Sequence, residues 1–366
     1  MCSRCDLRWC SSGSRRTCSS KRSRPPSPSR SDSMLEPNNL SNDELRDVAE
    51  RALPHWDLAA DAIELVSRSE NTVFKLTVRE GRAFALRIHR PGYHTLAELE
   101  SELVWTEALN AAGIHVPVGV RTLDGPGYAT VTTSDGLSSR AVGLVEWMEG
   151  ELLSSVIERE SDPKRVAAHF AEMGRILAAC HNQASDWTTP VGFTRHAFDL
   201  PGYVGDAPFW GRFWDIPILT PDQRAILGRA RQAIAKQLDE LAAEQQAFSM
   251  IHADLHAHNV LVRPDGALQI FDFDDAGWGW HQYDLAVALF RLQQRPDYDR
   301  IYQAMLAGYR EARPFSSQSE EWLPLFLLLR HLVVISWQWD RPELGRREGL
   351  EEWVEEGCRQ VEAFGI

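Results

Sequence analysis

The stretch Ile251-His-Ala-Asp-Leu-His-Ala-His-Asn-Val-Leu-Val-Arg-Pro-Asp-Gly-Ala-Leu-Gln-Ile-Phe-Asp-Phe-Asp-Asp275 decides how this chain folds. Its central Pro-Asp-Gly is strong turn chemistry between two apolar runs, so we predict two β-strands joined by this turn. Such a hairpin places Asp254 and Asn259 at one end and Asp272 close by. Phosphoryl transfer from a nucleotide needs a carboxylate that accepts the hydroxyl proton, and a carboxylate with an amide oxygen that hold Mg²⁺. The stretch therefore predicts a phosphoryl-transfer site.

Two segments of this stretch resemble the catalytic and metal-binding loops of the aminoglycoside phosphotransferase family: His252-Ala-Asp-Leu-His-Ala-His-Asn259 and Phe271-Asp-Phe-Asp274. Downstream, Tyr283-Asp-Leu-Ala286 also matches the family's pattern. That family has a protein-kinase-like fold and includes choline kinases and one type of homoserine kinase. The resemblance covers most of the chain from about Glu64 to the C-terminus.

The resemblance implies an α+β, protein-kinase-like fold with two lobes. Residues 34–148 would form a small nucleotide-binding lobe, an antiparallel sheet with one main helix. Residues 149–366 would form a larger, mainly helical lobe that carries the catalytic residues and binds the acceptor.

The resemblance also implies roles for individual residues. Asp254 would accept or orient the proton of the attacking hydroxyl, and Asn259 and Asp272 would ligate Mg²⁺. Asp274 is a weaker candidate for the second metal or its water shell, and Asp284 would cap a helix or brace the catalytic loop. The phosphate donor would be ATP, with GTP as the alternative. The acceptor would be a small-molecule hydroxyl, and aminoglycoside, homoserine, choline, sugar and protein acceptors all stay open.

The run Ala83-Phe-Ala-Leu-Arg-Ile88 predicts the strand of the nucleotide site. Alternation puts Ala85 and Arg87 on the face opposite the large apolar residues. Ala85 leaves room for adenine, and the cation at Arg87 reaches the phosphates. The family usually has Lys here, and Arg is larger and geometrically stricter. The alternative is an edge-strand Arg paired with a surface acid.

A helix is predicted from Thr95 to Asn110, and the resemblance to a kinase-like lobe implies that one acid on it orients Arg87. Counting back from Gly113-Ile-His-Val-Pro117, Glu102 best fits the family's position. Glu98 and Glu100 are rivals, and all three could simply be solvated.

The loop Ser67-Arg-Ser-Glu-Asn-Thr72 joins two predicted strands where the family covers the phosphates. It contains no glycine, so contacts with nucleotide would come from Ser69, from Asn71 or from backbone amides. An ordinary hairpin is the alternative. Farther on, backbone groups from Glu146 to Met148 would hydrogen-bond the adenine edge, unless the strand simply ends at Gly150.

Two other segments decide how the larger lobe is built. The connection from Asp186 to Pro221 is rich in aromatic residues, which would either line the acceptor pocket or cover the lobe. The apolar run from Leu323 to Ser336 is short and interrupted by Arg330 and His331, so we predict a core helix rather than a membrane span.

The composition is that of a globular protein: 366 residues, with a formal net charge of −13. The negative sign argues against nucleic-acid and anionic-membrane partners. Residues 1–33 carry eight basic and two acidic side chains, +6 in all, and predict a disordered basic tail. Its four cysteines form no defensible zinc spacing, and the rest of the chain has only Cys180 and Cys358. We therefore expect a cytoplasmic protein. The oligomeric state is not predicted.

Two other functions compete with a kinase. In an extended strand His252, Asp254, His256 and His258 would share one face, as a metal-dependent hydrolase requires. A kinase-like protein that binds nucleotide or metabolite without turnover is the third hypothesis. The intact Asp254, Asn259 and Asp272 argue against it.

Overall fold

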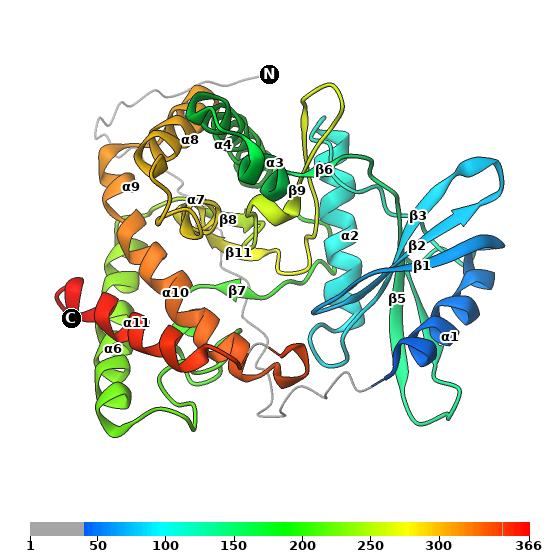
Figure 1. Ribbon diagram of the computed structural model, residues 1–366, viewed down its shortest axis with the longest axis horizontal. Helices are drawn as coiled ribbons and strands as arrows, with labels where there is room; N and C mark the ends of the chain where they lie inside the picture. The colour runs from blue at the N-terminus through cyan, green and yellow to red at the C-terminus, as the bar shows by residue number, and fades with distance from the viewer. Residues whose placement is uncertain (1–39, 346) are drawn as a thin grey trace, which may run out of the picture.

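The computed structural model describes residues 40–345 and 347–366. The predicted tail, residues 1–33 with its four cysteines, lies outside the described residues. The described part divides into a sheet lobe, at the right of Figure 1, and a larger helical lobe at its left. This is the α+β, two-lobe arrangement predicted from the sequence.

The smaller lobe is built on a five-stranded antiparallel sheet in the order β1-β2-β3-β5-β4. Its strands are β1 (Ala60–Arg68), β2 (Thr72–Val78), β3 (Ala83–Ile88), β4 (Tyr128–Thr132) and β5 (Ser139–Glu146). Strand β3 has the predicted bounds and the predicted alternation: Phe84, Leu86 and Ile88 are buried, at 3%, 0% and 1% exposure. The opposite face of β3 is thereby left to face the other lobe.

In the part of the chain that the structure describes, two α-helices belong to the sheet lobe. Helix α1 (Asn42–Ala52) covers the outer face of the sheet and begins with a capping box between Ser41 and Glu44. Helix α2 (Leu96–Ala111) begins with a second capping box between Thr95 and Glu98, and it lies between the sheet and the helical lobe in Figure 1. Both starts follow the Ser/Thr-x-x-Glu pattern that satisfies the free amides of a first turn.

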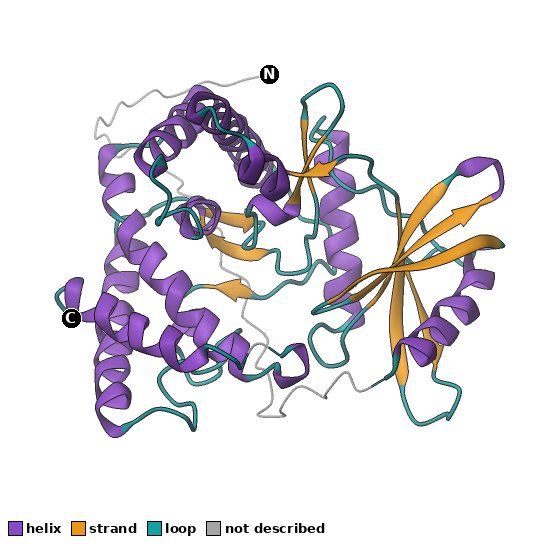
Figure 2. Ribbon diagram, viewed as in Figure 1, coloured by secondary structure: helices purple, strands orange, loops and turns teal. Residues whose placement is uncertain are grey.

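The larger lobe is mainly helical, as Figure 2 shows. Its helices are α3 (Leu153–Arg159), α4 (Pro163–Asp186), α5 (Leu200–Val204), α6 (Pro221–Ala243), α7 (His281–Phe290), α8 (Tyr298–Ala312), α9 (Ser317–Glu321), α10 (Leu323–Trp339) and α11 (Leu350–Ala363). Helices α4 and α8 approach closely at glycines: a Cβ on Gly308 would lie 1.9 Å from the Ala171 carbonyl oxygen. Their packing therefore depends on residues without side chains.

Two small sheets support residues 251–275, the stretch predicted to hold the phosphoryl-transfer site. They are β10-β9-β6 and β7-β11-β8, formed by β6 (Glu151–Leu152), β7 (Ala197–Phe198), β8 (Phe248–Ile251), β9 (Val260–Val262), β10 (Leu268–Ile270) and β11 (Gly277–Trp280). The hairpin β9–β10 was predicted, with Gly266 at φ 85° in its turn. The strands β6, β7 and β11 are too short to have shown a pattern in the sequence.

Helix α10 has the length and hydropathy of a membrane-spanning helix when α9 is counted with it, over Ser317–Trp339. However, 56% of its most apolar window is buried inside the molecule, and Leu325, Phe326 and Leu329 belong to the core of the helical lobe. The helix is packed as the core helix that the sequence predicts. The aromatic segment before α6 fits both of its interpretations, because Trp210 is 3% exposed and yet borders the main cavity.

Candidate active site

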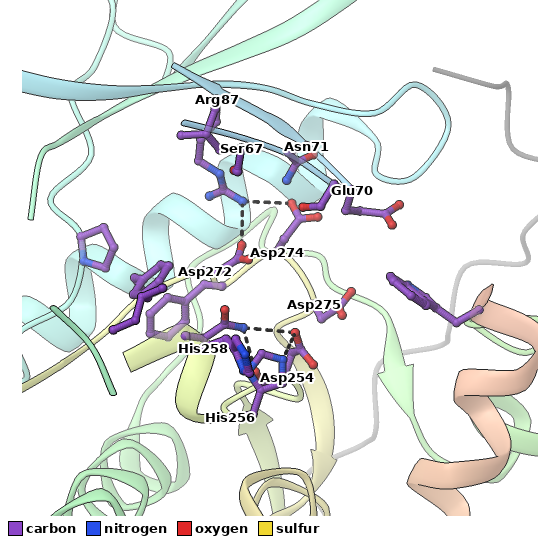
Figure 3. A pocket seen from close by; sticks show the side chains of 18 of the residues that line it. Ser67, Glu70, Asn71, Arg87, Asp254, His256, His258, Asp272, Asp274 and Asp275 are labelled. Atoms are coloured by element: carbon purple, nitrogen blue, oxygen red, sulfur yellow. Dashed lines mark hydrogen bonds and ion pairs between the residues drawn. The ribbon is translucent and has the colours of Figure 1, made fainter. Parts of the chain in front are cut away.

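A cavity of about 1410 Å³ lies between the two lobes. The sheet lobe lines it with the β1–β2 loop and β3, and the helical lobe with the catalytic stretch, α10 and α11. Figure 3 shows side chains from both lobes pointing into it. Every site residue predicted from the sequence borders this cavity: Ser69, Asn71, Ala85, Arg87, Glu102, Glu146, Met148, Asp254, Asn259 and Asp272.

The loop that carries Asp254 is held from beneath by Asp284 of α7. The Asp284 carboxylate, fully buried, accepts hydrogen bonds from the backbone N–H groups of His252, at 2.9 Å, and Ala253, at 2.6 Å. It also contacts His181 Nε2 at 3.0 Å. Ala253 takes a left-handed backbone conformation, φ 65°, that the anchored amide supports. Asp284 thus braces the loop and does not face the cavity.

Asp254 lies among polar partners. The Asn259 amide donates to its side chain at 3.1 Å and to its carbonyl oxygen at 2.9 Å, and Arg330 of α10 forms an ion pair with it. Burial alone would raise the pKa of Asp254, but the charges of His256 and Arg330 lower it below its ordinary value. Asp254 is therefore ionised at neutral pH and can accept a proton or a hydrogen bond. The Asn259 amide nitrogen faces Asp254, which leaves its oxygen for a cation.

Asp272 has a left-handed backbone, φ 67°, that turns its side chain toward the sheet lobe, where it meets Arg87 at 3.4 Å. Desolvation and the charge of Asp274 raise the pKa of Asp272, whereas the charge of Arg87 acts to lower it. Its side chain keeps 45% exposure, so solvent offsets part of that desolvation. An accessible carboxylate near an amide oxygen is the hard oxygen donor set that Mg²⁺ takes together with phosphates.

Arg87 lies at the centre of an acidic cluster. Its guanidinium bonds Glu102 Oε1 at 2.7 Å and Asp274 Oδ1 at 3.3 Å, and the Arg87 and Glu102 side chains are 13% and 5% exposed. Burial works to lower the pKa of Arg87, but Glu102, Asp274 and Asp272 together raise it. The rival acids have other partners: Glu98 caps α2, and Glu100 accepts the Gly127 N–H at 2.8 Å. Glu102 is thus the acid of α2 that contacts Arg87.

Where the sequence predicts the adenine edge to bind, fewer backbone N–H groups are available to donate than expected. Ala85 pairs with Val145 in the sheet and borders the cavity. The N–H groups of Glu146 and Trp147 donate to the carbonyls of Val118, at 2.8 Å, and Ala83, at 3.1 Å. The predicted donors to adenine are thereby reduced to the N–H of Met148.

The β1–β2 loop differs from an ordinary hairpin. Ser69 is exposed at its tip, and its N–H bonds the Asn71 carbonyl at 3.0 Å. Asn71 is only 6% exposed, and its side-chain oxygen accepts the Arg90 N–H at 3.3 Å. Asn71 therefore braces the loop, and only its amide nitrogen is left to face a nucleotide.

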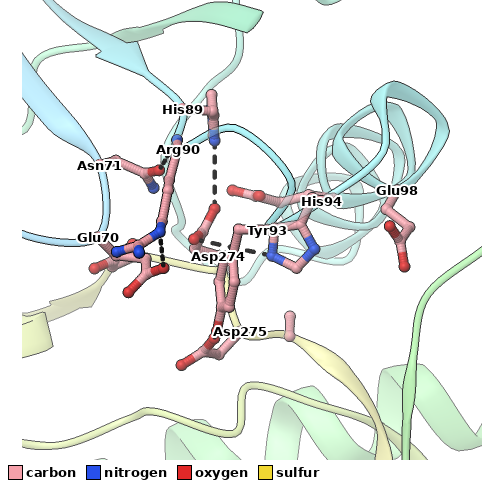
Figure 4. A network of polar contacts seen from close by, with 12 residues as sticks. Glu70, Asn71, His89, Arg90, Tyr93, His94, Glu98, Asp274 and Asp275 are labelled. Carbon is pink, nitrogen blue, oxygen red and sulfur yellow. Dashed lines mark hydrogen bonds and ion pairs between the residues drawn. The ribbon is translucent and has the colours of Figure 1, made fainter. Parts of the chain in front are cut away.

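Sequence reasoning missed Arg330, Asp275 and Tyr93. Tyr93 donates its hydroxyl hydrogen bond to Asp275, and Arg330 also lies over Trp210 at 5.8 Å from the ring. Figure 4 shows Tyr93 and Asp275 together beside Asp274. Asp274, the weaker metal candidate, also has two histidine neighbours: His89 and His94 approach it at 3.4 and 3.9 Å. Burial opposes its charge, but the His89 hydrogen bond, then His94 and Arg87, hold the pKa of Asp274 well below its ordinary value.

The predicted metal-binding strand of a hydrolase is wrong. Strand β8 ends at Ile251, and the residues that follow form a loop ending in a single 3₁₀ turn, Ala257–Asn259. His252 is 2% exposed and bonds the Phe271 carbonyl oxygen, because Asp284 holds its backbone inward. Among residues 40–345 and 347–366, one group of possible metal ligands has its ligand atoms within 4.8 Å of one another. The group consists of His94, Glu98 and His196, and it includes none of the four predicted residues.

Comparisons with known proteins agree with this geometry. Residues 61–315 match the model of the phosphotransferase enzyme family. The chain belongs to this family. The phosphotransferase is 22% identical to amicoumacin kinase of Bacillus subtilis over 297 residues, 78% of this chain and 82% of that protein. It is 26% identical to homoserine kinase of Pseudomonas aeruginosa over 294 residues, 76% and 81% of the two chains.

Solved structures place the phosphotransferase in the same fold. A microcompartment-associated aminopropanol kinase has a TM-score of 0.74 and 30% identity, covering 87% of this chain and 97% of that one. A choline kinase from Streptococcus pneumoniae, 15% identical, has a TM-score of 0.60 and covers 87% and 99%. The family resemblance and the kinase-like fold are thus confirmed, and the small-molecule kinases among its relatives support phosphotransferase activity for this chain.

Proposed function

We propose that this phosphotransferase transfers the γ-phosphate of ATP, bound with Mg²⁺, to a hydroxyl of a small amino alcohol. The observation that carries the proposal is the meeting of Asp254, Asn259 and Asp272 with the Arg87–Glu102 ion pair around one cavity. Phosphoryl transfer is achieved by positioning and charge stabilisation, and these groups supply both. A solved relative, an amicoumacin kinase, holds AMP-PNP and Ca²⁺, which supports a nucleotide and a divalent metal.

Each residue has a role in this proposal. Asp254 accepts the proton of the acceptor hydroxyl, and its low pKa keeps it ionised for that task. Asp272 and the Asn259 oxygen ligate Mg²⁺, which neutralises charge on the phosphates. Arg87 binds the α- and β-phosphates while Glu102 fixes its orientation.

The nucleotide would lie along the sheet lobe. Ala85 leaves space for adenine, the Met148 N–H faces its edge, and the carbonyl of Glu146 is the matching acceptor. Ser69 and the amide nitrogen of Asn71 would reach the phosphates from the β1–β2 loop. The Glu146 carbonyl would accept from the exocyclic amine of adenine, which favours ATP. GTP, whose base has a carbonyl at that position, is the alternative donor.

An amino alcohol is the acceptor class that two observations favour. Two relatives are named for homoserine and aminopropanol, each of which carries an ammonium group near a hydroxyl. In this chain the cavity beside Asp254 offers the carboxylate of Asp275 and the rings of Trp210 and Trp337. A carboxylate with aromatic faces suits a small cation.

A donor and acceptor screen tests the proposal. The full chain is incubated with Mg²⁺, with ATP or GTP, and with aminopropanol, homoserine, choline, an aminoglycoside or a neutral sugar. We expect release of nucleoside diphosphate that depends on an amino alcohol. Release with none of the acceptors would contradict transfer, and release only with the neutral sugar would contradict the acceptor class. The free, buried thiols of Cys180 and Cys358 accord with a cytoplasmic setting for the reaction.

A further inference from the structure

The β1–β2 loop is anchored to the helical lobe by a buried ion pair. Glu70, at the tip of this loop, contacts Arg341 through both of its carboxylate oxygens, one of them at 3.1 Å from Nη2. The two side chains are 15% and 1% exposed. Their positions in the sequence are 271 residues apart, so the contact joins opposite ends of the fold.

A second arginine completes the anchor. Arg90, at the end of β3, has a side chain that is 1% exposed and approaches Glu70 at 3.8 Å. It also pairs with Glu343, which lies two residues after Arg341. Figure 4 shows Glu70, Asn71 and Arg90 close together. Two buried cations are thus balanced by Glu70 and the more accessible Glu343, and loss of Glu70 would leave Arg341 buried without its counter-charge.

Arg341 has further contacts around its guanidinium. It follows the end of α10, and it donates to the Trp337 carbonyl at 3.2 Å. Its guanidinium lies over the rings of Trp337, at 4.8 Å, and Tyr93, at 5.2 Å. A guanidinium held by two rings and a carbonyl is a rigid support, so it can set the position of the loop through Glu70.

We propose that Glu70 and Arg341 are positioning residues, which hold the β1–β2 loop over the nucleotide phosphates from the opposite lobe. This rests on the proposed nucleotide site. The loop has no glycine, so its backbone cannot readily follow the phosphates by bending. The Glu70–Arg341 ion pair holds the loop in position instead. The affinity for nucleotide therefore depends on a residue after α10 that does not border the cavity.

The test compares Glu70→Gln, Arg341→Lys and the double variant with wild type. Glu70→Gln keeps the shape and removes the charge, and Arg341→Lys keeps the charge and removes the two-pronged contact. The control is Glu107→Gln, which breaks an exposed ion pair with Arg121, 2.9 Å, within the sheet lobe. Calorimetry measures AMP-PNP binding with Mg²⁺, hydrogen exchange follows residues 67–72 without nucleotide, and melting temperature monitors the fold.

We expect each single variant to weaken AMP-PNP binding roughly 5- to 100-fold, the span of coupling between contacting charged groups, and to speed exchange in the loop. The double variant should bind AMP-PNP no more weakly than the weaker-binding single variant, because both substitutions remove the same contact. Glu107→Gln should bind as wild type does. Should Glu70→Gln fail to fold, Glu70→Asp tests the same contact with a shorter reach.

The outcomes separate the two proposals. If wild type does not bind AMP-PNP, the proposed function fails and the positioning role fails with it. If wild type binds and Glu70→Gln binds equally well, only the positioning role is overturned. Additive losses in the double variant, or unchanged exchange in residues 67–72, would also overturn it.

Discussion

Arg87 gives the clearest prediction at the scale of single residues. Arg87→Ala should weaken nucleotide use strongly, and it should lower stability by about 3–5 kcal/mol because Glu102 and Asp274 stay buried without their cation. Arg87→Lys should keep most of the stability and part of the activity, since it restores charge without the fork. Steady-state kinetics and chemical denaturation measure the two effects. If Arg87→Ala turned over ATP with an unchanged KM, the assigned phosphate contact would be wrong.

Asp275 predicts a pH dependence of acceptor binding. Burial, then the charge of Asp254, raise the pKa of Asp275 to about 8. An ammonium group binds the ionised carboxylate, and a small amine stays protonated across pH 6–8.5. The KM for an amino alcohol should therefore fall as the pH rises from 6 toward 8.5, and Asp275→Asn should show a higher KM with a flat profile. A wild-type KM that does not change with pH would argue against this contact.

Site residues could be predicted from the sequence where a local pattern of residues indicated them. Alternation in one strand placed Arg87 on the face of Ala85, and the resemblance to the family singled out Glu102 on α2 as its partner. Arg330 and Arg341 could not be, because each meets an acid far away in the sequence, Asp254 and Glu70. In the sequence, Arg330 is only an interruption of the apolar run that forms α10. The role of the Arg330 charge becomes clear only when the fold brings Asp254 next to it.

Among the contacts between elements, the α4–α8 contact is sensitive to a single added atom. Gly308→Ala would place a Cβ 1.9 Å from the Ala171 carbonyl oxygen, so the helices must separate. We expect a loss of about 1–3 kcal/mol, the usual cost of overpacking. Gly228→Ala in α6 is the matched control, because a Cβ there meets nothing within 4 Å and should stabilise by about 0.5–1 kcal/mol. Urea unfolding of both variants measures this, and equal stabilities would contradict the packing.

The sequence predicts an element where its periodicity is long enough to read. Helices α2 and α10 and strand β3 follow their apolar patterns. The segment after Ile251 did not follow its pattern, since alternation of His252, Asp254, His256 and His258 suggested a possible strand. The backbone N–H groups of His252 and Ala253 donate to Asp284, which lies 32 and 31 residues away, and these bonds hold that segment as a loop. A distant side chain therefore overrode local periodicity.

At the scale of the whole molecule, the cavity between the lobes takes charged groups from both. The sheet lobe supplies Arg87 and Glu102, and the helical lobe supplies Asp254, Asn259 and Asp272. The central claim is that the two carboxylates have different tasks, with Asp254 serving the acceptor hydroxyl and Asp272 the metal. Removal of each carboxylate should therefore impair a different step, turnover for Asp254 and metal-dependent nucleotide binding for Asp272.

The most direct measurement is calorimetry of AMP-PNP binding at several Mg²⁺ concentrations, beside turnover, for Asp254→Asn and Asp272→Asn. Asp254→Asn should keep Mg²⁺-dependent binding and lose turnover by roughly 10²–10⁴-fold, the usual worth of a general base. Asp272→Asn should lose turnover with weakened binding that higher Mg²⁺ partly restores. The account is contradicted if Asp254→Asn abolishes Mg²⁺-nucleotide binding while Asp272→Asn leaves it untouched, or if neither variant changes turnover.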